Sequence, residues 1–248
     1  CALAAFVMTS SAAFAADSYP QRAIRLIIPY PPAGAGDIVG RMLSTRLSDR
    51  LGQQLVIDNR GGGGQVIATE MTAKAAPDGY TLLLASATHG VNPGLRDKLP
   101  YDSIKDFTPI TLVASSPLVF VAHPSLGVSN IKELVALAKS KPGQMNYAST
   151  GIGSTPHLCS AMFAVATGID IVHVPYKGGS QSTTDLIAGQ VQMYFGNASE
   201  LLPQAGNDRI RLIAVSSPER MAQLPDVPAM AEFLPGFDMA SWNGFLAP

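Results

Sequence analysis

The sequence is poor in cysteine, in charge and in long apolar runs, and each shortage excludes a class of protein. Only 2 of its 248 residues are cysteine, too few for the disulfide framework of a small secreted domain. Charged residues make up 14% of the chain, and the net charge of −1 gives no electrostatic support for nucleic-acid binding. After the N-terminal stretch, no apolar run approaches the roughly 20 residues that cross a bilayer.

The N-terminal stretch has the pattern of a secretory leader. Residues 1–16 are uncharged and apolar, and Ala13-Phe14-Ala15 is a signal-peptidase type of site. We therefore expect residues 1–16 to be the remnant of a signal peptide whose start is missing, and we expect the mature protein in a bacterial periplasm. A buried helix, or lipid attachment at Cys1, is the alternative. Cleavage after Ala15 would leave Cys159 alone, inside an apolar helical pattern typical of a core residue.

One short loop organises the first part of the chain. Residues 29–37 lie between a buried-strand pattern at 24–28 and a helical pattern at 37–51. Gly34 and Gly36 allow a close backbone approach, and Asp37 is placed to cap the helix. A loop of this kind directs free N–H groups and a helix dipole toward an anion. A plain connector with a capped helix is the alternative.

A second loop of the same kind occurs at residues 149–157. It is rich in hydroxyl groups and contains Gly151 and Gly153, and Pro156 suits the first turn of the helix that follows. Strand and helix patterns alternate in the part of the chain that contains each loop, which predicts two parallel α/β units with ligands at the carboxyl ends of their strands. Two such loops, one in each unit, predict a cleft that holds an anion from both sides.

Other chemistries have weaker support. Ser154 and His157 are three residues apart, but the G-x-S-x-G elbow of a hydrolase is absent. The histidines lack the spacing of metal ligands, so we expect no metal and no cofactor. The glycines at 61–64 are not followed by the Lys-Ser/Thr of a P-loop, so we interpret them as a turn. Lys177 is either a cation for the ligand or a solvated turn residue.

Several motifs together resemble the tripartite tricarboxylate transporter substrate-binding proteins, the TctC-like or Bug family of periplasmic receptors. The matching segments run in order from Tyr19 to the end of the chain. They are Tyr19-Pro20, the 29–37 loop, Asp58-Asn59-Arg60, Pro77-Asp78-Gly79-Tyr80-Thr81-Leu82, Asp106-Phe107-Thr108-Pro109-Ile110, Pro142-Gly143, residues 149–158, His173-Val174-Pro175-Tyr176-Lys177-Gly178, Asp185-Leu186, Leu224-Pro225-Asp226-Val227-Pro228 and Trp242-Asn243-Gly244.

The resemblance implies a fold, a function and a set of ligand contacts. The implied fold is α/β with two lobes, of the type II periplasmic-binding-protein kind, in which each lobe is a mostly parallel sheet flanked by helices and the ligand cleft lies between the lobes. The implied function is a receptor, not an enzyme, that carries a small carboxylate to a membrane permease. The implied ligand-binding residues are Tyr30, Gly34, Gly36, Asp37, Ser86, Thr88, Ser149, Thr150, Gly151, Gly153, Ser154, Thr155 and Asn197.

On the same basis, we expect residues 17–117 and 217–248 to form lobe 1, with its C-terminal part cut short, and residues 118–216 to form lobe 2. The ligand would be a di- or tricarboxylate, an acidic amino acid or an aromatic acid, bound by a monomer. A ligand sensor that acts on a signalling partner and, with less support, a Ser/His hydrolase are the alternatives. The chain departs from the family at Ala33 and Gly36, where glycine and a hydroxyl residue are common, and a lost hydroxyl would alter ligand preference.

Overall fold

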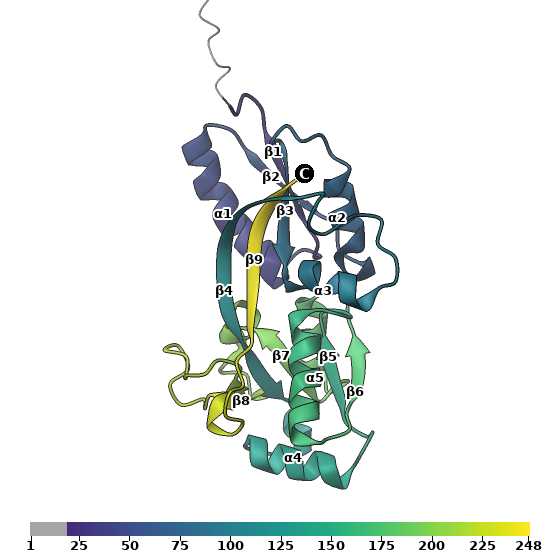
Figure 1. The fold of residues 1–248 in the computed structure, drawn as a ribbon. Coiled ribbons are helices and arrows are strands. Elements are labelled where there is room, and N and C mark those ends of the chain that lie inside the picture. The colour runs from purple at the N-terminus through teal and green to yellow at the C-terminus, as the bar shows by residue number, and fades with distance from the viewer. Residues whose placement is uncertain (1–18) are drawn as a thin grey trace, which may run out of the picture.

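The computed structural model describes residues 19–248, so the predicted signal-peptide remnant at 1–16 lies outside the described residues. Figure 1 shows two lobes stacked end to end, with the strands β4 and β9 running from one lobe to the other. All the strands belong to one sheet of order β2-β1-β3-β9-β4-β7-β5-β6, with β8 pairing with β4. The α/β prediction is confirmed, and the complete sheet is mixed.

Lobe 1 is built on three parallel strands. β1 (Ile24–Ile28) lies between β2 (Leu55–Asn59) and β3 (Thr81–Ser86). Leu26, Ile27 and Ile28 are fully buried, as expected for an apolar strand covered on both faces. The helices of this lobe are α1 (Ala35–Leu51), α2 (Val66–Ala73) and α3 (Ala87–Leu95), with a short 3-10 turn, η1 (Gly63–Gln65), before α2.

Two antiparallel strands join the lobes. β4 (Thr108–Ala122) pairs with β9 (Ala240–Ala247) from Thr108 to Pro117. From Leu118 onward β4 pairs instead with β7 (Met193–Asn197) and β8 (Arg211–Val215). The change of partner at 117/118 makes this point of β4 the natural site for a hinge.

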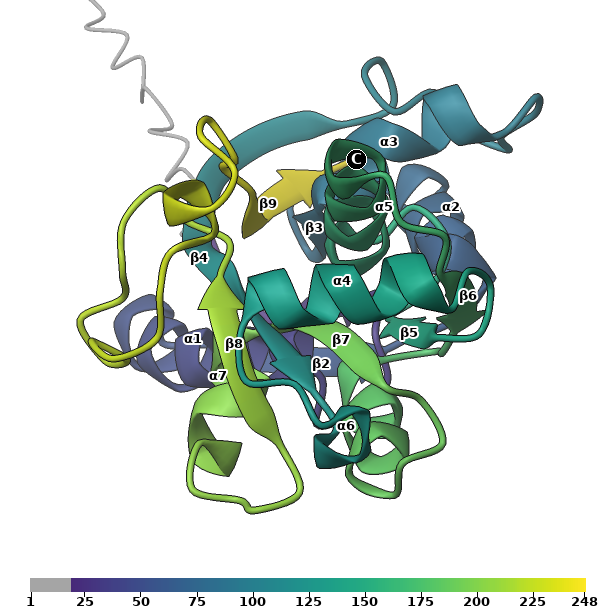
Figure 2. The ribbon, with the colours of Figure 1, turned by 90° about the horizontal axis from the view of Figure 1, so that it is seen from below.

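Lobe 2 has three layers, which Figure 2 shows from below. Its parallel strands are β5 (Asn146–Ser149), β6 (Val172–Pro175) and β7. Helices α4 (Ile131–Ser140) and α5 (Thr155–Thr167) cover one face, and α6 (Gly179–Ile187) and α7 (Ala198–Leu201) cover the other. The packing on the α5 side centres on Phe120, whose ring stacks on Phe195 at 4.1 Å between centroids.

Three predicted elements differ from those observed. Residues 211–215 were expected to be the return crossing, but β8 stays in lobe 2 and β9 makes the crossing. Residues 86–90 were expected to be the small, polar end of strand 80–85, but α3 begins there at Ala87, and the linker expected at 95–108 is irregular after the end of α3. The strand expected at 118–122 begins ten residues earlier, because residues 108–117 pair with β9. The sequence did not predict this part, since the exposed residues 108–112 lack the apolar pattern of a buried strand. The predicted Asn130 cap of α4 is confirmed, since its side chain accepts the Glu133 N–H at 3.0 Å.

The assignment of residues 217–239 depends on their packing. Met230 and Phe237 lie in the same hydrophobic cluster as Leu118 and Phe120, on the sheet of lobe 2. We therefore propose that the C-terminal contribution to lobe 1 is β9, and that residues 217–239 move with lobe 2.

Candidate functional site

A small cleft lies between the lobes, where the carboxyl ends of their parallel strands face each other. One part of it, the Lys177 end, has a volume of about 80 Å³. The other part, the Glu200 end, has about 10 Å³, room for roughly one water molecule. Tyr30 and Thr150 line both parts, so the two parts adjoin. The lining of the Lys177 end consists of Pro29, Tyr30, Gly62, Gly63, Gly64, Gln65, Thr88, Thr150, Gly151, Ile152, Ser154, Tyr176 and Lys177. The lining of the Glu200 end consists of Tyr30, Ala35, Gly36, Thr150, Gly179, Asn197, Glu200, Ser241 and Asn243.

The first loop is held in shape by Asp37. Helix α1 begins at Ala35 with Gly34 as its N-cap, so Asp37 is not the cap that the sequence predicted. Its carboxylate reaches back to accept the Ala33 N–H at 2.9 Å and also accepts Arg41 Nε at 2.9 Å. Although burial opposes ionisation, these hydrogen bonds hold the pKa of Asp37 below its ordinary value. Asp37 lines neither end of the cleft, because its oxygens bond Ala33, Arg41 and Asn59.

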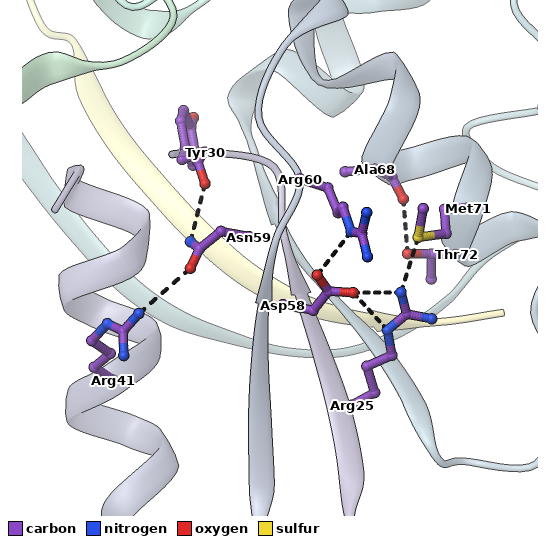
Figure 3. A network of polar contacts seen from close by, with 9 residues as sticks. All are labelled: Arg25, Tyr30, Arg41, Asp58, Asn59, Arg60, Ala68, Met71 and Thr72. Carbon is purple, nitrogen blue, oxygen red and sulfur yellow. Dashed lines mark hydrogen bonds and ion pairs between the residues drawn. The ribbon is translucent and has the colours of Figure 1, made fainter. Parts of the chain in front are cut away.

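Figure 3 shows how β2 supports this loop. The Asn59 amide donates to the carbonyl oxygen of Tyr30 at 3.0 Å and to Asp37 Oδ1 at 3.0 Å. The preceding residue, Asp58, accepts Arg25 and Arg60 and so fixes the end of the strand. Within the Asp58-Asn59-Arg60 segment, Asn59 therefore supports the cleft wall through the backbone carbonyl of Tyr30.

Three side chains form a closed ring of hydrogen bonds at the cleft wall. The Tyr30 hydroxyl donates to Ser86 Oγ at 3.0 Å, Ser86 Oγ donates to Gln65 Oε1 at 3.0 Å, and Gln65 Nε2 donates to the Tyr30 hydroxyl at 2.6 Å. Burial raises the pKa of Tyr30, so the phenol stays neutral. Sequence reasoning proposed Tyr30 and Ser86 but missed Gln65, which follows the glycines interpreted as a simple turn. Gln65 has φ 71°, a strained conformation for a non-glycine residue and one that is common at binding sites.

One hydroxyl at the Lys177 end lacks a partner. Thr88 is 2% exposed, and its Oγ1 has no hydrogen-bond partner among residues 19–248. A buried hydroxyl without a partner costs about 1–3 kcal/mol. Because Thr88 also lines the cleft, this hydroxyl is suited to a hydrogen bond with a bound ligand.

The second loop uses much of its polarity internally. Ser149 Oγ accepts the Gly151 N–H at 3.1 Å and lies 2.6 Å from His173 Nε2. Ser154 caps α5 by accepting the His157 N–H at 3.4 Å, and the Gly153 N–H donates to His157 Nδ1 at 3.2 Å. Ser154 and His157 are therefore engaged in shaping the loop, without the contact between hydroxyl and imidazole that a hydrolase needs.

The predicted ligand residues divide into two groups. Those that line the cleft are Tyr30, Gly36, Thr88, Thr150, Gly151, Ser154 and Asn197. Those that lie behind the lining, where they shape it, are Gly34, Asp37, Ser86, Ser149, Gly153 and Thr155.

Sequence reasoning predicted Tyr30, Gly36, Thr150 and Asn197 at the Glu200 end but missed Glu200 itself. Glu200 lies on α7, directly after β7, and its Oε1 accepts the Ala35 N–H of α1 at 2.7 Å. Its Oε2 accepts the Tyr194 hydroxyl at 3.2 Å. Burial raises the pKa of Glu200, against the opposing hydrogen bonds from Ala35, Tyr194 and Asn197. The only signal in the sequence was a carboxylate soon after the end of a predicted strand.

No group of three or more His, Cys, Asp or Glu side chains between residues 19 and 248 is arranged to hold a metal ion. Over the same range, no helix is both long and apolar enough to cross a membrane.

Comparisons with known proteins agree with this geometry. The family model described as "Tripartite tricarboxylate transporter family receptor" matches residues 39–248. Protein BugT of Bordetella pertussis is 38% identical over 98% of this chain and 76% of its own length. The solved structure of periplasmic binding protein BugD is 34% identical, with a TM-score of 0.88 over 93% of this chain and 77% of that one. R. palustris Rpa4515 with adipate is 33% identical, with a TM-score of 0.87 over 93% of this chain and 78% of that one.

Proposed function

This chain belongs to the tripartite tricarboxylate transporter receptor family, and on that premise we propose that it binds a small carboxylate between its two lobes and delivers it to a membrane permease. The proposal includes a periplasmic location, a monomeric receptor and the absence of catalysis. The observation that carries it is the cleft itself, in which Thr88 of lobe 1 and the 150–154 loop of lobe 2 line one cavity with polar groups.

The chemistry of the Lys177 end supports a carboxylate. Lys177 supplies a positive charge, and Thr88 and Ser154 supply hydroxyls. Hydrogen bonds from preorganised donors to an ionised oxygen are roughly twice as strong as neutral ones, and they strengthen as water leaves the cleft. The adipate bound by the structural neighbour Rpa4515 is a ligand of this chemical class.

The two-lobe architecture supports a closing mechanism. Only β4 and β9 are continuous hydrogen-bonded strands between the lobes in the described part of the chain, so a small change near 117/118 reopens the cleft. A ligand that contacts both lobes favours the closed form by its differential affinity for that form. The closed receptor would then present one shape to the permease.

A thermal-shift screen against small carboxylates, followed by calorimetry, tests the proposal. A ligand that binds only the folded state stabilises it by mass action, by about 2.7 kcal/mol at a ligand concentration 100 times Kd. The melting temperature rises as a result. We expect a shift with at least one carboxylate, and NMR should recover that compound unchanged. Uptake of the labelled ligand by cells, lost on deletion of the receptor, separates transport from sensing. Conversion of the ligand would contradict the receptor assignment.

A further inference from the structure

The Glu200 end of the cleft already contains a carboxylate that belongs to the protein. Glu200 reaches from lobe 2 to the first turn of α1 in lobe 1, where its Oε1 lies 2.7 Å from the Ala35 nitrogen. The fit is close, because a Cβ placed on Gly179 would overlap the Glu200 carboxylate. Glu200 therefore occupies the position at the N-terminus of α1 where an anionic ligand group would otherwise bind.

The other amides of the first loop are also engaged. The Ala33 N–H donates to Asp37 at 2.9 Å, and the Gly34 N–H donates to the Pro31 carbonyl at 3.4 Å. With Ala35 bound to Glu200, three successive N–H groups of this loop have partners within the protein. A second ligand carboxylate at this end would have to displace Glu200 or lie against it.

Glu200 has hydrogen-bond donors but lacks a cation. Ala35, Tyr194 and Asn197 donate to it, yet no Lys, Arg or His between residues 19 and 248 forms an ion pair with it. Ionised carboxylates in protein interiors are normally paired with a positive charge. The part of Glu200 that is not covered lines a space of about 10 Å³, near the size of one ammonium group.

From this arrangement we propose that Glu200 determines ligand selectivity, so that the receptor takes small zwitterions whose ammonium group faces Glu200 and whose carboxylate faces the Lys177 end. The inference rests on the proposed function and narrows its ligand class. The two ends of the cleft differ in charge, and Tyr30 and Thr150 line the passage between them. A dicarboxylate of the same length would place like charges together at the Glu200 end.

Matched ligand pairs test this selectivity by calorimetry. Succinate and 4-aminobutyrate, glutarate and 5-aminopentanoate, and adipate and 6-aminohexanoate each replace one terminal carboxylate with an aminomethyl group. We expect the full chain to bind the amino acid of at least one pair about 10-fold or more tightly than its dicarboxylate. Equal affinities, or tighter binding of the dicarboxylate, would overturn the inference and leave the proposed function standing.

Three variants assign the preference to Glu200. Glu200→Gln keeps an oxygen that accepts the Ala35 N–H but removes the charge, and it should lower the ratio of affinities about 10-fold. Gly179→Ala keeps the charge but displaces the side chain, and it should lower the ratio as well. Asp208→Asn removes an exposed carboxylate away from the cleft lining and should leave the ratio unchanged.

Different results would contradict the role of Glu200 and the proposed function. An unchanged ratio in folded Glu200→Gln protein would overturn the role of Glu200. If Glu200→Gln fails to fold, the ratio measured on the unaltered chain still decides the zwitterion preference. If the unaltered chain binds neither member of any pair and no other carboxylate, the proposed function fails, and the inference fails with it.

Discussion

The carboxylate of Glu200 accepts a hydrogen bond from the backbone N–H of Ala35 at 2.7 Å, although 165 residues separate the two in the sequence. The bond joins α7 of lobe 2 to the N-terminus of α1 in lobe 1. The first loop does bind a carboxylate, as its glycines and helix dipole indicate, but the carboxylate in the structure is the protein's own. This contact places the two lobes of the structure in a closed arrangement.

Closure brings Gly178 of lobe 2 against Pro31 of lobe 1. A Cβ on Gly178 would lie 2.6 Å from Pro31 Cγ, and the extended backbone at Gly178, with φ −176°, accepts alanine. We expect Gly178→Ala to fold normally but to close incompletely. Overpacking of this kind costs about 1–3 kcal/mol, so calorimetry should show a loss of ligand affinity of roughly 10-fold.

The matched control for this change is Gly206→Ala. A Cβ on Gly206 meets nothing within 4 Å, so this variant should bind like the unaltered protein. Small-angle scattering of the ligand-saturated proteins adds a direct readout, because Gly178→Ala should stay more extended. Unchanged affinity and an unchanged scattering profile in Gly178→Ala would show that lobe closure does not govern binding.

Gly153 and Gly168 both have a left-handed backbone conformation, but only Gly153 lies against the other lobe. It has φ +78°, and a Cβ on it would lie 2.6 Å from Leu95 Cδ1 of lobe 1, whereas Gly168 has φ +64° and nothing within 4 Å. Alanine in a left-handed conformation costs about 1–2 kcal/mol at either position. Denaturant unfolding should therefore show similar losses of stability in Gly153→Ala and Gly168→Ala. Only Gly153→Ala should also weaken ligand binding, by about 3- to 10-fold, and equal affinities in the two variants would show that Gly153 does not shape the cleft.

Thr88 separates ligand binding from stability. Because its Oγ1 has no partner in the described residues, Thr88→Val should leave the free energy of unfolding unchanged or raise it. The same change removes a hydrogen bond to the ligand and should cost about 1 kcal/mol of binding, roughly 5-fold in Kd. Thr72→Val is the control. It removes the hydrogen bond from Thr72 to the Ala68 carbonyl, 3.0 Å in length, so it should lower the free energy of unfolding and leave Kd unchanged. A Thr88→Val variant with full affinity would exclude this hydroxyl as a ligand contact.

His173 makes stability depend on pH. Burial, with a smaller contribution from the neighbouring His157, lowers its pKa to about 4 in the folded protein. An unfolded histidine titrates near 6.5, so the unfolded chain takes up the proton first as the pH falls. His173 thus has no effect above pH 6.5, and it costs stability increasingly between pH 6.5 and 4.

The expected size of the effect is modest, because His173 is partly exposed. After a discount for solvent screening, about 1 kcal/mol should be lost between pH 7 and 5, which lowers the melting temperature by roughly 2–4 °C. His173→Gln can still bond Ser149 but does not titrate, so its melting temperature should fall less over this range. A fall as steep as that of the unaltered chain would assign the pH dependence to other groups.

The sequence was informative wherever a local signal decides the structure. The apolar run at 24–28 and the Asn130 cap of α4 were predicted correctly, because burial and capping leave clear patterns. Contacts between distant segments leave no such pattern. Gln65 reaches the cleft only because β1 and β3 place Tyr30 and Ser86 beside it. Similarly, no local feature indicates that Glu200 meets Ala35.

The exposed first part of β4 could not be predicted from the sequence for the same reason. Residues 108–112 are exposed and include a proline, so they lack the alternation that predicts a strand. They are extended because β9, more than 100 residues later, pairs with them. The lobe crossing was for that reason assigned to residues 211–215, the next clear apolar strand, rather than to β9.

A calorimetric titration of the full chain with the paired dicarboxylates and amino acids tests directly whether a carboxylate binds between the lobes. We predict saturable one-to-one binding of at least one carboxylate, with the ligand recovered unchanged and the affinity reduced in both Gly178→Ala and Thr88→Val. A carboxylate site between the lobes would be contradicted if no acid bound, or if both variants bound the ligand as tightly as the unaltered chain does.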